Sequence, residues 1–181
     1  MAERQAVVDH MRLTYEGLFS VTELYKTIDR WLRDKGYDKC EQKNIEKVTP
    51  EGKYIEIQIE PWKKLSDYAK SVIKLRMIMD EVKEVEVERD NKKVKLNQGK
   101  IQMIFDAFLE TDYEHRWEGS PLFYFFKVII DKYISKPFTS GYQNNVLDDL
   151  NHFHSLIKSF LNLYRYSETA WTSKKQQKYK F

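Results

Sequence analysis

The sequence has little of several residue types, and each shortage argues against a class of protein. Its 181 residues include a single cysteine, Cys40, so we expect no intrachain disulfide and a reducing, cytoplasmic environment. No apolar run approaches the roughly 20 residues that a membrane helix needs. The first ten residues lack the apolar segment of a secretory signal, so we expect none. The six glycines are dispersed, and no glycine-rich phosphate-binding loop can be drawn.

Sequence signatures of enzymes are also missing. Neither a Gly-x-Ser-x-Gly nor a His-Glu-x-x-His motif is present, and Cys40 has no histidine near it in sequence, which favours an inert thiol. His152 and His154 are two residues apart on a predicted helix and point in different directions, so they do not share one metal. Asp148 and His152 have i,i+4 spacing, which favours a surface ion pair. We therefore predict a protein that is not an enzyme, with no cofactor and no metal site.

What the sequence does contain is a strong two-residue period. Apolar and polar residues alternate over residues 55–59, 73–79 and 101–109, which predicts three long strands with one buried face each. A similar alternation from Val8 predicts a first strand that ends near Gly17. The polar stretch 39–48 is typical of an edge strand.

Between the long strands, local signals predict turns. Residues 82–87 are expected to form a short strand that leads to a hairpin tip at Asp90–Lys93. Asn97-Gln98-Gly99 is expected to turn the chain into the last long strand.

Three helices are predicted. The first begins at Ser20, which has capping-box spacing to Glu23, and ends at Gly36. The second begins at Ser120-Pro121 and ends at Lys136-Pro137. The third spans about residues 144–164, where apolar side chains recur every three or four positions.

This order predicts one α+β domain over residues 1–165. Its core is an antiparallel sheet of five to seven strands with one N-terminal helix and two C-terminal helices. The layout is similar in outline to a helix-grip fold of the START or Bet v 1 type, in which a cavity between sheet and helix can hold an apolar ligand. Residues 166–181 have no periodicity and are predicted to be a basic, disordered tail.

The formal net charge of +3 is concentrated in that tail, where four lysines face only Glu168. Two further basic clusters lie at residues 62–64 and 92–95. Exposed lysines beside aromatic side chains suit phosphates and stacked bases, although lysines at strand edges also discourage aggregation. The predicted nucleic-acid-binding residues are Trp62, Lys63, Lys64, Lys92, Lys93, Lys95, Lys174, Lys175, Lys178 and Lys180. The leading hypothesis is a binding protein that contacts RNA or the ribosome.

Two alternatives stay open. One is a helix-grip protein that binds an apolar small molecule. The other is a self-associating scaffold whose oligomer contact consists of Leu122, Phe123, Phe125 and Phe126, because residues 122–130 are apolar on nearly every side.

One mainly acidic cluster and one single aspartate have no assigned role in these hypotheses. Glu110, Asp112, Glu114 and His115 could bind a cation or take part in acid–base chemistry, but a solvated loop is the simpler interpretation. Asp106 lies between apolar residues and would need a partner if both faces of its strand are covered.

Five short motifs carry a resemblance to a family. They are Gly17-Leu18-Phe19, Trp31 with Lys35-Gly36-Tyr37, Leu109-Glu110-Thr111-Asp112-Tyr113, Trp117-Glu118 with Ser120-Pro121, and Phe160-Leu161-Asn162-Leu163-Tyr164-Arg165. In these motifs the chain resembles a group of small uncharacterised archaeal proteins without an assigned activity. The resemblance covers roughly residues 11–165 and implies an archaeal, cytosolic protein. It implies no site.

Overall fold

The computed structural model describes residues 3–89, 92–111 and 135–178. Its elements in chain order are β1 (Glu3–Phe19), α1 (Val21–Asp34), β2 (Glu41–Thr49), β3 (Gly52–Ile59), β4 (Trp62–Lys64), β5 (Ala69–Arg89), β6 (Lys92–Thr111) and α3 (Ser135–Lys178). The strands form one antiparallel sheet in the order β1-β6-β5-β3-β2, and the short β4 pairs with β5. The predicted α+β class with an antiparallel sheet is therefore confirmed.

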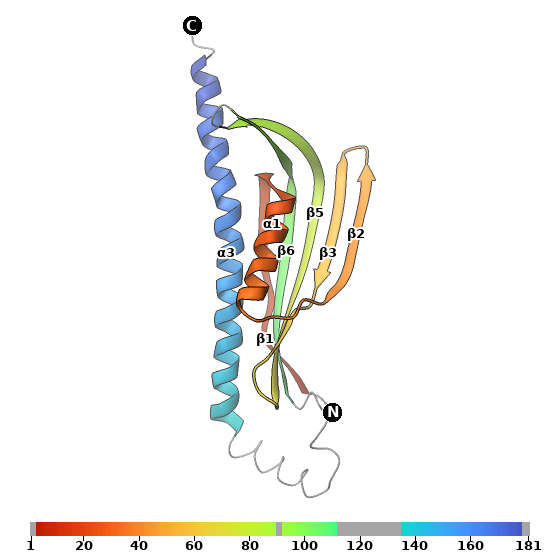
Figure 1. The fold of residues 1–181 in the computed structure, drawn as a ribbon, viewed down its shortest axis with the longest axis vertical. Helices are drawn as coiled ribbons and strands as arrows, with labels where there is room; N and C mark the ends of the chain where they lie inside the picture. The colour runs from red at the N-terminus through yellow and green to blue at the C-terminus, as the bar shows by residue number, and fades with distance from the viewer. Residues whose placement is uncertain (1–2, 90–91, 112–134, 179–181) are drawn as a thin grey trace, which may run out of the picture.

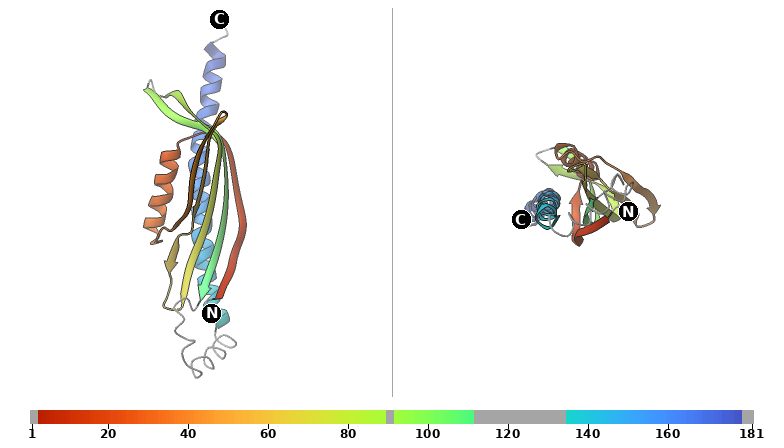
Figure 2. Two further views of the ribbon diagram at one scale, coloured as in Figure 1. Left: turned by 90° about the vertical axis from the view of Figure 1, so that its right-hand side faces the viewer. Right: turned by 90° about the horizontal axis from the view of Figure 1, so that it is seen from below.

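The sheet is long and curved, and both described helices cover the same face of it (Figures 1 and 2). α3 runs along the whole length of the sheet, and α1 lies beside it. β1 and β2 form the two edges. Within the described residues no helix is both long and apolar enough to cross a membrane.

The two-residue period of the sequence corresponds to the buried inner face. Leu13, Met103, Met77 and Ile57 are aligned in one row across β1, β6, β5 and β3, and all four are buried. Rows of this kind bury one face of every long strand. The sheet therefore needs α1 and α3 as a covering layer.

The helix α1 forms where its local signals predict it. Ser20 is the N-cap, and its hydroxyl accepts a hydrogen bond from the Glu23 backbone N–H at 3.3 Å. Gly36 ends the helix with a φ of +71°, a left-handed conformation that glycine adopts without strain.

The turn predicted at Asn97–Gly99 is wrong, because β6 continues through it. Gly99 instead pairs with Gly17 of β1 and faces a register shift of β5 just after Asp80. A Cβ atom on Gly99 would lie 2.9 Å from the Asp80 carbonyl oxygen, and one on Gly52 would lie 2.7 Å from the Glu81 carbonyl carbon. Gly99 on β6 and Gly52 on β3 thus allow close backbone contact where β5 bulges at Glu81, a device that bends sheets.

The C-terminal helices differ from the prediction. The described chain has one helix there rather than two, and it begins at Ser135. Pro137 does not end a helix but lies in the first turn of α3, where a missing N–H leaves no bond unmade. Most of the predicted helix over residues 120–136 lies outside the described residues.

The apolar stripe predicted for the final helix is confirmed. Val146, Leu150, Phe153 and Ile157 are all buried against the sheet. The predicted boundary at Arg165 falls inside α3, which continues to Lys178 because residues 166–178 contain neither glycine nor proline.

Candidate functional site

The predicted cluster on β4 does not present its three side chains to one surface. Alternation along the strand separates Lys63 from Trp62 and Lys64. Lys63 lies under α3, with its Nζ 3.6 Å from Asp149 Oδ2, whereas Lys64 pairs with Asp67 at 2.9 Å. The half-exposed Trp62 ring has Lys70 Nζ at 5.5 Å from its centroid.

Two of the three predicted lysines on the β6 strand of the β5–β6 hairpin, Lys93 and Lys95, are paired in register with glutamates of β5. Lys95 Nζ lies 2.8 Å from Glu84, and this bond holds the pKa of Glu84 below its usual range. In the strand register Lys95 pairs with Glu86, and Lys93 pairs with Glu88. Lys92 is the first residue of β6 and pairs with Arg89. The positive charge of this hairpin is therefore largely balanced within the hairpin itself.

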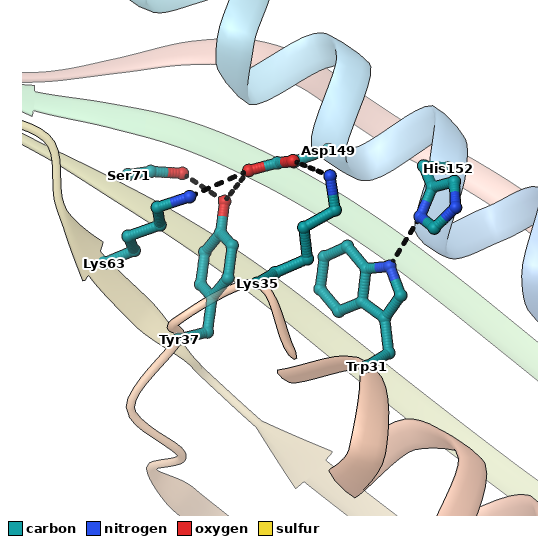
Figure 3. Close-up of polar contacts among 7 residues, drawn as sticks. All are labelled: Trp31, Lys35, Tyr37, Lys63, Ser71, Asp149 and His152. Atoms are coloured by element: carbon teal, nitrogen blue, oxygen red, sulfur yellow. Dashed lines mark hydrogen bonds and ion pairs between the residues drawn. The ribbon is translucent and has the colours of Figure 1, made fainter. Parts of the chain in front are cut away.

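A polar group that joins four elements lies beneath α3; we call it the Asp149 cluster (Figure 3). Asp149 accepts hydrogen bonds from Lys35 Nζ at 2.9 Å and from the Tyr37 hydroxyl at 3.2 Å, with Lys63 close by. The Tyr37 hydroxyl also lies 2.9 Å from the buried Ser71 hydroxyl. Burial raises the pKa of Tyr37, so its hydroxyl stays protonated. Each group is satisfied by another, which is typical of a structural contact.

An aromatic stack continues this contact along α3. Trp31 Nε1 donates a hydrogen bond to His152 Nδ1 at 2.7 Å (Figure 3), so the partner of His152 is Trp31 and not the predicted Asp148. The Trp31 ring stacks on Phe153 with centroids 4.3 Å apart, and Phe105 of β6 meets Phe153 edge-on at 5.6 Å. Together with the Asp149 cluster, these rings fix the position of α3 on the sheet.

Asp106, for which the sequence analysis predicted no specific partner, has a hydrogen-bond partner in the structure. Its Oδ1 accepts a 2.7 Å hydrogen bond from the His10 backbone N–H. His10 adopts a φ of +56° beside a register shift in β1, and its Nδ1 contacts Asp9. The ligand atoms of Asp9, His10 and Asp106 lie within 4.8 Å of one another, so they could share a metal ion. Since Asp9 and His10 are exposed and bonded to each other, a surface network accounts equally well for the group.

A cleft lies between the edge strand β1 and α3; we call it the β1–α3 cleft. It has a volume of about 270 Å³ and is lined by residues 12–15 of β1 and by His154, Lys158, Leu161 and Asn162 of α3. Arg12 and Lys158 are exposed, and neither has a carboxylate partner among the described residues. The cleft lining contains no acidic residue.

His154 connects the two walls of this cleft. Its imidazole hydrogen-bonds to the backbone of Arg12 and meets the Phe105 ring edge-on, with centroids 5.5 Å apart. Burial lowers the pKa of His154 below 6.5, and the charge of Lys158 lowers it further. At neutral pH the imidazole in this cleft is therefore mainly uncharged.

A second cleft differs from the first in that its lysines are paired with carboxylates. It has a volume of about 330 Å³ and lies at the N-terminal end of α1. Its two lysines are both paired, Lys53 with Glu46 and Lys95 with Glu84, each at 2.8 Å. This cleft has no excess positive charge.

The charge of α3 changes along its length. Up to Phe153 the helix contains Lys136, Asp148 and Asp149. Residues 154–178, which we call the basic arm, contain Lys158, Arg165, Lys174, Lys175 and Lys178 against Glu168. The end of the arm extends past the sheet, at the end of the molecule where the β5–β6 hairpin lies (Figures 1 and 2).

Several predicted residues lie outside the described part of the chain. They are Lys180, the proposed oligomer contact Leu122, Phe123, Phe125 and Phe126, and the acidic-cluster members Asp112, Glu114 and His115. The remaining member, Glu110, is described. It pairs with Lys70 at 2.7 Å and Arg4 at 3.5 Å on the outer face of the sheet.

The comparisons with known proteins add no family. The chain matches no protein-family model, and no curated protein is significantly similar to it.

Proposed function

We propose that the protein is a non-enzymatic RNA-binding protein that contacts RNA or the ribosome through the basic arm of α3. The change of charge along α3 supports this proposal most directly. Five basic residues against one acidic residue give residues 154–178 a net charge of +4, while the rest of the helix is slightly acidic. Affinity for nucleic acid depends on cations that neutralise phosphates, and a cation already paired with a carboxylate contributes little.

The composition of the arm favours single-stranded RNA. Tyr164, Tyr166 and Trp171 lie among its basic residues. Proteins that bind single strands combine a positively charged track with aromatic side chains on which bases stack. The archaeal origin and the cytoplasmic location of the protein both stay predictions.

The lysines of β4 and of the β5–β6 hairpin are expected to contribute less to RNA binding than those of the arm. Lys63, Lys64 and Lys95 each have a carboxylate within 4 Å. Binding a phosphate there would require breaking an existing ion pair. The arm is therefore the better candidate for the main contact.

Sedimentation with ribosomes and with bulk RNA, at low and at high salt, tests the proposal. One variant carries Lys174→Ala, Lys175→Ala and Lys178→Ala, which removes charge while keeping good helix formers. We expect this variant to lose most co-sedimentation at low salt and the wild type to lose it at high salt.

The matched control carries Lys64→Ala, Lys93→Ala and Lys95→Ala, which removes the same number of charges elsewhere. It should sediment like the wild type. Absence of co-sedimentation for the wild type, or its loss only in the control variant, would reject the proposal.

A helix-grip protein that binds an apolar ligand is the second candidate. Its support is the topology: β1 lies next to the last strand β6, and the C-terminal helix lies across the inner face. Against it, Trp31, Phe105 and Phe153 fill the space between sheet and helix at the level of Phe153. Self-association through residues 122–126 stays a prediction.

A further inference from the structure

A β-bulge in β1 brings three potential metal ligands together on the outer face of the sheet. Phe105 and Ala107 are buried in the core, so alternation puts Asp106 between them on that outer face. The register of β1 against β6 shifts at this point, and Asp9 and His10 together oppose the single residue Asp106. His10 has a φ of +56°, and its Nδ1 atom lies 2.5 Å from Asp9 Oδ1 and 3.8 Å from Asp106 Oδ1. The bulge therefore directs two consecutive side chains toward one carboxylate.

Asp106 is a buried carboxylate with only one of its oxygens bonded. The residue is 9% exposed, and its Oδ1 accepts the 2.7 Å hydrogen bond from the His10 backbone N–H. Within the described residues its Oδ2 has no hydrogen-bond donor, and Lys74, its register partner on β5, forms no ion pair with it. Buried polar oxygens normally have a partner. The surface contact between Asp9 and His10 leaves this oxygen without one, whereas a bound cation would supply it.

The donor set favours a transition-metal ion. Imidazole nitrogen suits zinc, copper, iron and nickel, and carboxylate oxygen also binds zinc, whereas magnesium and calcium prefer oxygen ligands alone. Zinc bonds of about 2.0 to 2.2 Å put two ligand atoms of a tetrahedral site roughly 3.4 Å apart. The distance of 3.8 Å between His10 Nδ1 and Asp106 Oδ1 is close to this value. The Asp9 side chain is 70% exposed, so it is free to adjust its position relative to His10.

We infer that Asp9, His10 and Asp106 bind one divalent transition-metal ion of the zinc class, with water completing its coordination. The ligand atoms of the three residues lie within 4.8 Å of one another. The ion joins the bulge of the edge strand β1 to β6 where the register between them is interrupted, which is a structural role. This site goes beyond the RNA-binding proposal and does not depend on it. The sequence alone gives no sign of the site, because Asp106 is 96 positions from His10.

Zinc chloride titrated into the full chain at neutral pH tests the site through the imidazole signals in NMR spectra. We expect the His10 signals to shift until one equivalent of zinc is bound. The signals of His152 should stay unchanged, because its Nδ1 already accepts a hydrogen bond from Trp31. Magnesium chloride at the same concentration should leave the His10 signals unchanged.

Two variants each remove one ligand while they preserve the local backbone. Asp106→Asn keeps an oxygen that can accept the hydrogen bond from the His10 backbone N–H, and His10→Asn keeps a residue type that tolerates positive φ. Each should weaken zinc binding, measured by calorimetry, at least about tenfold, since even the loss of an outer-shell partner costs about 10- to 100-fold in metal affinity. Asp148→Asn is the matched control, because it makes the same substitution at an exposed position of α3. It should bind zinc like the wild type.

Three results would overturn the inference. They are no shift of the His10 signals with zinc, an equal shift with magnesium, and an affinity of the Asp106→Asn variant equal to that of the wild type. The last result would mark any bound zinc as adventitious. The signals of His152 and His154 show whether each variant is folded, and the two ligand variants lie on different strands, so either of them alone decides the question.

Discussion

Replacing Gly99 by alanine tests how the sheet is bent. The added Cβ would lie 2.9 Å from the Asp80 carbonyl oxygen, 3.1 Å from Val82 Cα and 3.2 Å from Val82 Cγ2. Ordinary contacts begin near 3.4 Å, so β5 and β6 must separate locally by about half an ångström. Two of the three atoms belong to the backbone and cannot rotate away.

The expected cost follows from these contacts. Overpacking of this kind costs about 1 to 3 kcal/mol, and the lower chain entropy of alanine in the unfolded state returns about 0.5 to 1 kcal/mol. Taking the middle of both ranges, Gly99→Ala should lower the free energy of unfolding by about 1 kcal/mol. Urea unfolding followed by tryptophan fluorescence measures it, since Trp31 is buried in the core. The midpoint should fall with an unchanged slope.

Gly141→Ala is the matched control, because a Cβ at Gly141 meets no atom within 4 Å and the residue lies in α3. Alanine there should stabilise the protein by up to about 1 kcal/mol. Both substitutions replace glycine by alanine, but they should change the free energy of unfolding in opposite directions. A Gly99→Ala protein as stable as the wild type would refute the account of the bend.

Three further predictions concern α3. Asp149→Asn should lower the free energy of unfolding by about 1 to 2 kcal/mol, because it removes the negative charge and replaces one of the two acceptor oxygens by an NH₂ donor. Asp148→Asn, at an exposed position, should change it by less than about 0.5 kcal/mol. Urea midpoints of the two variants test the difference. Phe153→Ala should cost about 3 to 5 kcal/mol by opening a cavity at the ring stack, measured in the same way. The pKa of folded His154 is depressed, so the unfolded chain binds the extra proton. Stability should therefore be complete above pH 6.5 and decline as pH falls below it. His154→Gln should make that decline shallower in thermal melts, and an unchanged pH profile would contradict the assignment.

Local signals account for what the sequence predicts correctly. Ser20, Glu23 and Gly36 define both ends of α1 within 17 residues of chain, and alternation defines the buried faces of the long strands. Both patterns depend on neighbours in sequence. They need no knowledge of the tertiary fold.

The errors come from signals with two physical meanings. A glycine such as Gly99 marks a turn or a close backbone approach, and only the neighbouring strand decides which. Pro137 ends one helix or begins another, and the described structure has it in the first turn of α3. The helix after Arg165 lacks an apolar period but also lacks any residue that stops a helix.

The candidate site could be predicted only in part. The lysines of the arm are visible in the sequence, but the glutamate that pairs with Lys95 is known only once β5 and β6 are in register. Arg12 and Lys158 are 146 positions apart, and no local pattern brings them to one cleft. From the sequence, His154 could only be judged against His152, with which it does not share a metal, although the structure has it in the wall of that cleft.

The salt dependence of RNA binding tests the central claim most directly. Fluorescence anisotropy with a labelled single-stranded RNA gives log Kd against log salt, whose slope is about 0.7 per phosphate neutralised. Removing Lys174, Lys175 and Lys178 together should reduce that slope by about 2, because three phosphate contacts are lost. The variant lacking Lys64, Lys93 and Lys95 should keep the wild-type slope. An unchanged slope in the arm variant, or salt-independent binding by the wild type, would contradict the account.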